Sequence, residues 1–327
     1  MPDPEILPSL QPSPPPAPSF LRTVFVGPNG IRAGWRVLIF LALVAAIVLF
    51  VGLAAAIPIA LLHVDKNSIN KIGAAASGLT PLGLSLSEGA LFLFPTIAAL
   101  IMARIEHRKY GQYGLPIRFA FRKDFWIGTL VGFAAISGCL LGIFAFHGFR
   151  LTGLAAHGGM ILSATAAWGA TFILVGLGEE FSFRGYLQYT LSSGIGFWPS
   201  AILLSLLFGL AHKSNPGESN YGLLSVVLFG LLFCLFLRRT GNLWWAVGFH
   251  AGWDWGQTFF YGVADSGIPP YHNLFNSTFS GPRWLTGGTV GPEASIFTPI
   301  VLVIVGTLFT RVYRENRYQQ QASDLGA

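Results

Sequence analysis

Long apolar runs separated by short polar segments dominate the pattern of hydrophobic and polar positions along this chain. A helix needs roughly 20 apolar residues to cross the hydrocarbon core of a bilayer. Eight runs approach that length, and they lie near Trp35–Leu62, Leu82–Ala103, Phe125–Phe146, Met160–Gln188, Phe197–His212, Tyr221–Leu237, Leu243–Tyr261 and Ile296–Val312. The fifth is short, and the fourth is long enough to be tilted or to extend beyond the hydrocarbon. The pattern predicts an all-α, polytopic transmembrane helix bundle with about eight spans.

Basic residues are distributed unevenly between the connecting segments. With a cytoplasmic N-terminus, the inside segments carry fifteen: Arg22, Arg32, Arg36, Arg104, Arg108, Lys109, Arg118, Arg122, Lys123, Arg184, Arg238, Arg239, Arg311, Arg314 and Arg317. The outside segments carry five: Lys66, Lys71, Arg150, Lys213 and Arg283. Because Lys and Arg accumulate in cytoplasmic loops, we expect both termini to be cytoplasmic, in the plasma (inner) membrane if the source is bacterial. A variant with six or seven spans and one re-entrant segment stays open.

The segments outside the apolar runs define the predicted organisation of the chain. Residues 1–34 are expected to form a disordered, Pro-rich tail and a juxtamembrane segment, since residues 1–18 hold eight prolines and no Lys or Arg. This tail lacks the charged region of a signal peptide. Residues 35–317 form the predicted transmembrane domain, and 318–327 a polar C-terminal tail. The Gly- and Pro-rich segment 263–295 is expected to be an outside loop, either a lid or unstructured.

The amino-acid composition supports a membrane protein and argues against a nucleic-acid partner. Hydrophobic residues make up 53% of the chain and charged residues 10%, against about 25% charged in a soluble domain. The net charge of +6 is spread between apolar runs rather than gathered in one patch, so it predicts no nucleic-acid partner. The lipid bilayer is the expected surrounding.

Three acids lie deep inside predicted spans: Glu179, Glu180 and Asp254. Glu88 lies near the start of the second span, at a level consistent with the interface. An ionisable residue in a membrane core is costly and so indicates a functional site, although a neutralised ion pair between helices is the structural alternative. Glu180 and Arg184 are four residues apart in the favourable order for a helical ion pair.

Glu179 is rotated by about 100° from Glu180 around the helix. We therefore expect Glu180 to be a structural, charge-compensated residue and Glu179 to be free for chemistry. Two histidines join them: His212 ends the fifth span, and His250 lies four residues before Asp254 in the seventh. At 1.5 Å per residue, Glu179, His212 and Asp254 lie about 20–24 Å from the cytoplasmic turns and His250 about 14 Å, so they can meet inside the membrane.

The motifs Glu179-Glu180-x-x-x-Arg184, Phe208-x-x-x-His212 and His250-x-x-x-Asp254 resemble those of the CPBP family. This family comprises CAAX prenyl endopeptidases and bacteriocin-processing (Abi) enzymes, and the resemblance covers about residues 160–260. It implies an intramembrane endopeptidase that hydrolyses peptide bonds of membrane-associated or CAAX-like peptide and protein substrates. It further implies that Glu179 with His212 activates water, and that His250 with residue 254 stabilises the oxyanion.

Residue 254 departs from the common family pattern, in which this position is usually Asn. Asn donates a hydrogen bond, whereas an ionised Asp cannot. Asp254 would therefore stay protonated, orient His250, or ligate a metal. Glu179, His212, His250 and Asp254 would make a plausible zinc set with an open position, yet we expect no obligatory metal cofactor.

Two other functions fit the buried polar groups. A non-enzymatic immunity or scaffold protein would keep the fold without the activity. A proton or ion carrier would use Glu179, Glu180 and Asp254 for transport. The complete set of three motifs favours the protease.

Overall fold

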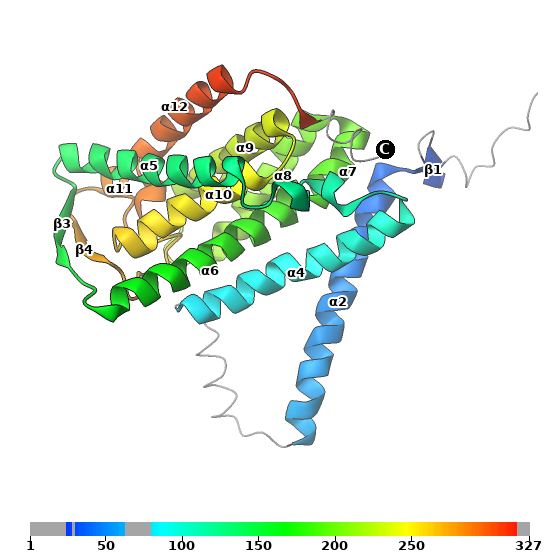
Figure 1. Cartoon of the computed structure of the whole chain (residues 1–327), viewed down its shortest axis with the longest axis horizontal. Coiled ribbons are helices and arrows are strands. Elements are labelled where there is room, and N and C mark those ends of the chain that lie inside the picture. The colour runs from blue at the N-terminus through cyan, green and yellow to red at the C-terminus, as the bar shows by residue number, and fades with distance from the viewer. Residues whose placement is uncertain (1–23, 28–29, 63–79, 319–327) are drawn as a thin grey trace, which may run out of the picture.

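The structure of the chain is a computed structural model that describes residues 24–27, 30–62 and 80–318. Most of the described chain is helical (Figure 1). The helices are α2 (Ala33–Leu61), α4 (Pro81–Ile105), α5 (Lys123–Ala145), α6 (Gly159–Arg184), α7 (Tyr186–Ile195), α8 (Phe197–Ala211), α9 (Asn220–Thr240), α10 (Trp244–Asp254), α11 (Arg283–Thr286) and α12 (Phe297–Val312). The strands are β1 (Val26–Gly27), β2 (Gly30–Ile31), β3 (Phe149–Leu154) and β4 (Phe275–Phe279). The short 3-10 helices are η1 (Tyr110–Tyr113), η2 (Ile117–Phe119), η3 (His212–Ser214) and η5 (Pro292–Ala294).

A helical membrane protein is confirmed, and each predicted span coincides with a helix. Within the described part of the chain, five segments are long and apolar enough to cross a membrane: α2, α4, α5, the run Gly159–Ile195 and α9. The other three predicted spans are shorter helices, with 15 residues in α8, 11 in α10 and 16 in α12. By helix length, five segments can therefore cross the membrane completely, fewer than the eight spans that hydropathy predicts.

The structure differs from the sequence-based prediction at three places. The fourth predicted span breaks at Gly185, which separates α6 from α7. The seventh continues beyond Asp254 as the π-helical segment η4 (Trp255–Phe260). The segment 263–295, expected to be a loop, contains β4, α11 and η5, and β4 pairs antiparallel with β3. Strands escaped prediction because each of them is short and lies between apolar helices.

The tails expected at the ends of the chain lie mostly outside the described residues. Residues 1–23 of the predicted N-terminal tail and 319–327 of the C-terminal tail are not described. The described part of the N-terminal segment contains the two-residue strands β1 and β2, which pair directly before α2 begins.

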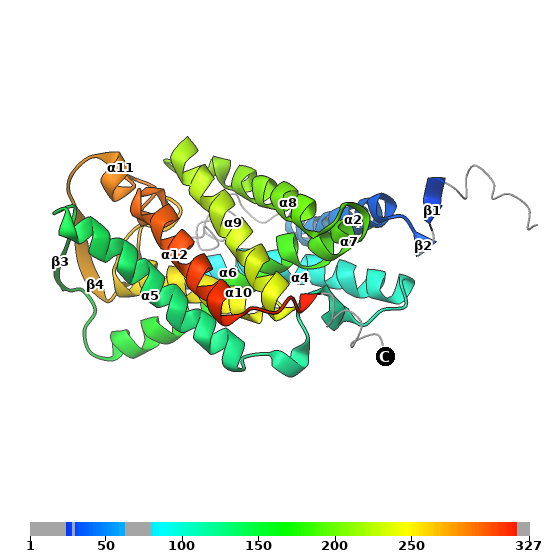
Figure 2. The ribbon, with the colours of Figure 1, turned by 90° about the horizontal axis from the view of Figure 1, so that it is seen from above.

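Helices α4, α6, α10 and α5 lie side by side, whereas α2 diverges steeply from α4 (Figure 1). Figure 2 shows α9 and α12 crossing this row. Helix α2 is held near its N-terminal end, where Arg36 donates to Glu106 at the end of α4. Tyr186 of α7 donates to the same carboxylate at 2.5 Å. The polar contact thus ties α2, α4 and α7 together at one end of the bundle.

Glycines set the closest helix contact in the bundle. A methyl group at Gly128 or Gly132 of α5 would collide with backbone carbonyls of α10, and one at Gly248 or Gly252 of α10 would collide with carbonyls of α5. Both pairs are spaced by four residues, the spacing that lets two membrane helices approach through their backbones. His250 lies between the two α10 glycines, so this contact fixes its height and direction.

Candidate active site

Glu179 and Glu180 leave α6 in different directions. The side chain of Glu180 has no exposed surface, and its Oε1 lies 3.5 Å from a guanidinium nitrogen of Arg184 one turn later. The guanidinium carbon of Arg184 lies 4.1 Å from the centre of the Phe208 ring, a cation–π contact. Glu179 keeps 17% of its side-chain surface exposed, and that surface faces a cavity. The expected ion pair between Glu180 and Arg184 is present.

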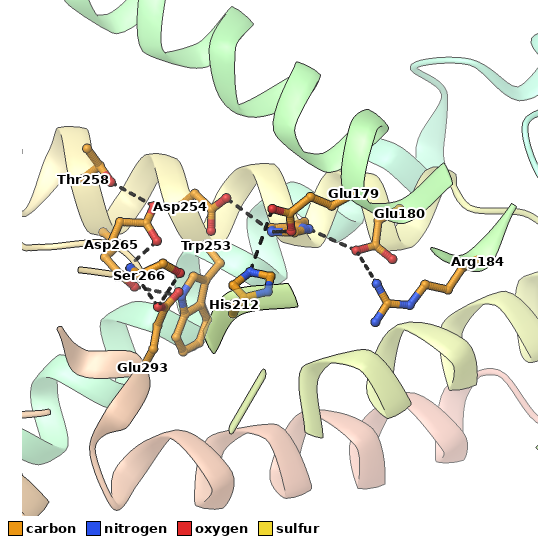
Figure 3. A network of polar contacts seen from close by, with 12 residues as sticks. Glu179, Glu180, Arg184, His212, Trp253, Asp254, Thr258, Asp265, Ser266 and Glu293 are labelled. Atoms are coloured by element: carbon orange, nitrogen blue, oxygen red, sulfur yellow. Dashed lines mark hydrogen bonds and ion pairs between the residues drawn. The ribbon is translucent and has the colours of Figure 1, made fainter. Parts of the chain in front are cut away.

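His250 is the one residue of α10 that is not fully buried. Its Nδ1 lies 3.1 Å from Oε1 of Glu180, while its Nε2 lies 3.6 Å from Oε2 of Glu179 and 3.4 Å from Oδ2 of Asp254. The ring also stacks on Phe233 of α9, with centroids 5.2 Å apart. Three carboxylates and one aromatic face therefore hold this imidazole. Figure 3 labels the three carboxylates, Glu179, Glu180 and Asp254.

His212 lies at the point where α8 ends and η3 begins. Its Nδ1 lies 2.9 Å from the carbonyl oxygen of Phe208, one turn earlier. An Nδ1–H that donates to this carbonyl leaves Nε2 as the acceptor nitrogen. Nε2 lies 3.9 Å from Oε1 of Glu179 (Figure 3), too far for a direct hydrogen bond. A water molecule beside both atoms can bond to both.

A cavity of about 340 Å³ connects these groups. Its lining comes from α4, α6, α8, α9, α10 and the segment after η4, and it contains Glu179, His212, His250 and Asp254. Aromatic and aliphatic side chains make up most of the remaining wall, including Trp168, Phe172, Phe208, Phe229 and Trp253. An apolar cavity with a few convergent polar groups is the usual form of a ligand-binding or catalytic site.

Comparison with known families gives a match in the same part of the chain. Residues 161–256 match the family model described as type II CAAX prenyl endopeptidase Rce1-like. This match supports the resemblance of residues 161–256 to the CPBP family of CAAX proteases. No curated protein sequence matches the chain.

The Rce1-like region contains all seven site residues expected from the sequence: Glu179, Glu180, Arg184, Phe208, His212, His250 and Asp254. The structure brings them together from α6, α8, η3 and α10. The family implies a protease that acts in a membrane. The sequence predicts Glu180 only as the ion-pair partner of Arg184. In the structure Glu180 also contacts His250.

Three further carboxylates lie in the same cavity, outside the Rce1-like region. Glu88 of α4, placed near the interface by its position in the sequence, lines the wall beside Glu179. Asp265 and Glu293 come from the segment 263–295, in which they are the only two acids. Their position in a Gly- and Pro-rich segment whose only other Asp, Glu, Lys or Arg is Arg283 is the one signal that the sequence offers. Asp265 and Glu293 come together only because the segment 263–295 folds back onto the cavity, and no local sequence pattern predicts that fold.

Hydrogen bonds hold Asp265 and Glu293 at the end of the cavity near Asp254. Asp265 accepts from Thr258 at 3.0 Å, and Glu293 accepts from the backbone N–H and the hydroxyl of Ser266, each at 3.0 Å (Figure 3). Both acids lie outside the helical spans. Burial raises the pKa of Asp265 to about 6, and burial together with repulsion from Asp265 raises the pKa of Glu293. This end of the cavity therefore holds protons more readily than an exposed carboxylate would.

The arrangement of possible ligands bears on a zinc ion. Of the described His, Cys, Asp and Glu side chains, Asp254, Asp265 and Glu293 form the group whose ligand atoms all lie within 4.8 Å of one another. The four candidates from the Rce1-like motifs do not converge in this way. Three carboxylates suit a hard cation, whereas catalytic zinc prefers imidazole donors. The group of Asp254, Asp265 and Glu293 is therefore not the zinc set expected from the sequence, with which it shares only Asp254.

Proposed function

We propose that this protein is an intramembrane endopeptidase that hydrolyses peptide bonds of membrane-associated substrates, CAAX-like C-termini among them. The observation that carries the proposal is the position of Glu179. Its two carboxylate oxygens face Nε2 of His212 and Nε2 of His250, at 3.9 and 3.6 Å, on the wall of a cavity lined mostly by apolar side chains. A carboxylate in this position can accept a proton from a water molecule.

In the proposed reaction, Glu179 and His212 hold and activate the water. Its oxygen attacks the carbonyl carbon of the scissile peptide while its proton passes to the Glu179 carboxylate. The hydrogen bond between Nδ1 of His212 and the Phe208 carbonyl keeps Nε2 available as an acceptor for the same water. A general base of this kind contributes about 10²- to 10⁴-fold in rate.

His250 and Asp254 stabilise the oxyanion that forms on the attacked carbonyl. His250 in its protonated form donates Nδ1–H to Glu180 and presents Nε2–H to the cavity. Asp254 contributes a hydrogen bond in its protonated form, because an ionised carboxylate has no donor. Donors fixed before the reaction stabilise developing charge without reorganisation.

We propose the remaining features on the same basis. The chain would cross the membrane about eight times, with α8, α10 and α12 as short spans and both termini cytoplasmic, in the plasma (inner) membrane if the source is bacterial. The reaction would need no obligatory metal. Reporter fusions after residues 62, 146 and 318 would test the topology, with an external signal expected for the first two and a cytoplasmic signal for the third.

The activity itself is testable with the purified full-length protein in liposomes. Incubation with a library of membrane-anchored peptides, followed by mass spectrometry of the products, should give cleavage at defined bonds. A proton or ion carrier would instead dissipate a gradient across the liposome membrane without cleaving any peptide. A scaffold protein would do neither, and either result would contradict the proposal.

A further inference from the structure

Glu88 is a carboxyl group of the cavity that the proposed mechanism leaves without a role. It lies on α4, more than 70 residues before the Rce1-like region, and its side chain lines the same cavity as Glu179, His250 and Asp254. Among the described residues that line this cavity there is no Lys or Arg. Glu88 thus reaches this cavity from α4, the helix that packs against α6.

The packing of α4 on α6 brings Glu88 to the level of Glu179. A methyl group at Gly178, the residue before Glu179, would lie 2.9 Å from the carbonyl oxygen of Glu88 and 3.2 Å from its Oε2. Only a glycine permits this approach. The side chains of Glu88 and Glu179 line the same cavity, so two ionised carboxylates there would repel each other.

The Glu88 carboxyl group is also incompletely satisfied. Its Oε2 is buried and has no hydrogen-bond partner in the described part of the chain. Glu179, His212, His250 and Asp254 each have a polar neighbour within 4 Å. A buried ionised carboxylate with an oxygen that lacks a hydrogen-bond partner is unfavourable inside a membrane. A protonated one avoids the repulsion from Glu179 and supplies an O–H donor to the cavity.

We propose that Glu88 is a second catalytic carboxyl group, the general acid that protonates the leaving amine. This inference rests on the proposed protease activity. After water adds to the carbonyl carbon and Glu179 takes its proton, the C–N bond breaks, the electron pair stays on nitrogen, and nitrogen takes the proton of Glu88. The proton on Glu179 then passes to the Glu88 carboxylate, which restores both groups for the next cycle.

Two substrates of one sequence test this role, a peptide and its ester analogue at the scissile bond. An amine leaves only when its nitrogen is protonated, whereas an alcohol depends far less on an acid. In liposomes, Glu88→Gln should lower kcat for the peptide by about 100-fold, leave KM within about twofold, and reduce ester hydrolysis by only a few-fold. The decline of wild-type kcat at alkaline pH should be absent from the variant, and Glu88→Asp should recover part of the loss.

Two controls separate this role from a structural one. Glu315→Gln makes the same chemical change at a side chain that is 71% exposed and should leave both reactions unchanged. Equal losses on peptide and ester, or full peptide activity in Glu88→Gln while Glu179→Gln is inactive, would overturn the role of Glu88 and leave the protease intact. A wild-type protein that cleaves neither substrate would overturn both.

Discussion

Oε1 of Glu180 lies 3.1 Å from Nδ1 of His250 and 3.5 Å from a guanidinium nitrogen of Arg184. One buried oxygen therefore joins the helix that carries the proposed base to the histidine of the proposed oxyanion site. Glu180 has no exposed surface and does not line the cavity, so it acts on the reaction through His250.

Substitution Glu180→Gln should lower kcat by about 10- to 100-fold with little change in KM. Partners that orient a functional histidine have effects of this size in metal sites, and the amide cannot match the charge of the carboxylate. Steady-state kinetics on one peptide substrate measures the change. A rise in KM at constant kcat would show instead that Glu180 shapes the binding surface.

Removal of the Glu180 side chain should also destabilise the protein. Glu180→Ala leaves the Arg184 guanidinium buried without its carboxylate, a change that costs about 3–5 kcal/mol. The double variant Glu180→Ala/Arg184→Met should recover a large part of that loss. Unfolding in detergent measures both, and no recovery in the double variant would contradict a charge-based explanation.

The contact between α5 and α10 predicts a second stability effect. A methyl group at Gly252 meets the Thr129 backbone, so Gly252→Ala should destabilise the bundle by about 1–3 kcal/mol and move His250, with a loss of turnover. Gly138 on α5 is the matched control, because a methyl group there meets nothing within 4 Å. Gly138→Ala should be neutral or stabilising, as Ala favours a helix by about 1 kcal/mol. Equal effects at the two sites would contradict the role of the glycine contact.

Contacts between residues close in sequence can be predicted from the sequence, whereas several contacts between distant segments of this site cannot. Glu180 with Arg184 and His250 with Asp254 follow from a spacing of four residues on one helix. The meeting of α6, α8 and α10 follows from their hydropathy and from the position of each polar residue along its span. The contact of Glu88 with the Glu179 region depends instead on the helix pair that forms around Gly178. Asp265 and Glu293 depend on a chain reversal between η4 and α12, which spacing alone does not define.

The raised pKa of Asp265 predicts a dependence of stability on pH. In the folded protein this pKa is about 6, against an ordinary value of 3.8, so the folded state binds more protons than the unfolded state between these values. The stability that Asp265 contributes is fully present below about pH 4 and is lost as pH rises through about 6, a change of about 3 kcal/mol. Asp265→Asn removes this dependence.

Unfolding of wild type and Asp265→Asn at several pH values between 4 and 7.5 checks this sign. The wild type should lose stability relative to the variant as pH rises, and the difference should level off above about pH 7. A difference that is constant with pH, or that favours the wild type at high pH, would contradict a protonated Asp265 in the folded protein.

Removing metal ions tests whether the reaction depends on Glu179 without a metal or is that of a metalloprotease. The proposed reaction uses Glu179 and His212 to activate water and needs no obligatory metal. Dialysis against a chelator should therefore leave turnover within about twofold of the untreated protein, far from the loss of about 10²-fold or more that removal of a catalytic group causes. Elemental analysis of the active protein provides the second measurement. A stoichiometric metal, with activity lost to the chelator and restored by that metal, would show that the reaction needs one.

The turnover of Glu179→Gln tests the proposed base most directly. The amide keeps the shape of the side chain but cannot accept a proton from water, so kcat on a cleaved peptide should fall by at least about 100-fold while unfolding stability stays close to that of the wild type. Glu315→Gln, an exposed site, should keep full activity in the same liposomes. Turnover by Glu179→Gln within a few-fold of the wild type would contradict the assignment of Glu179 as the group that activates water.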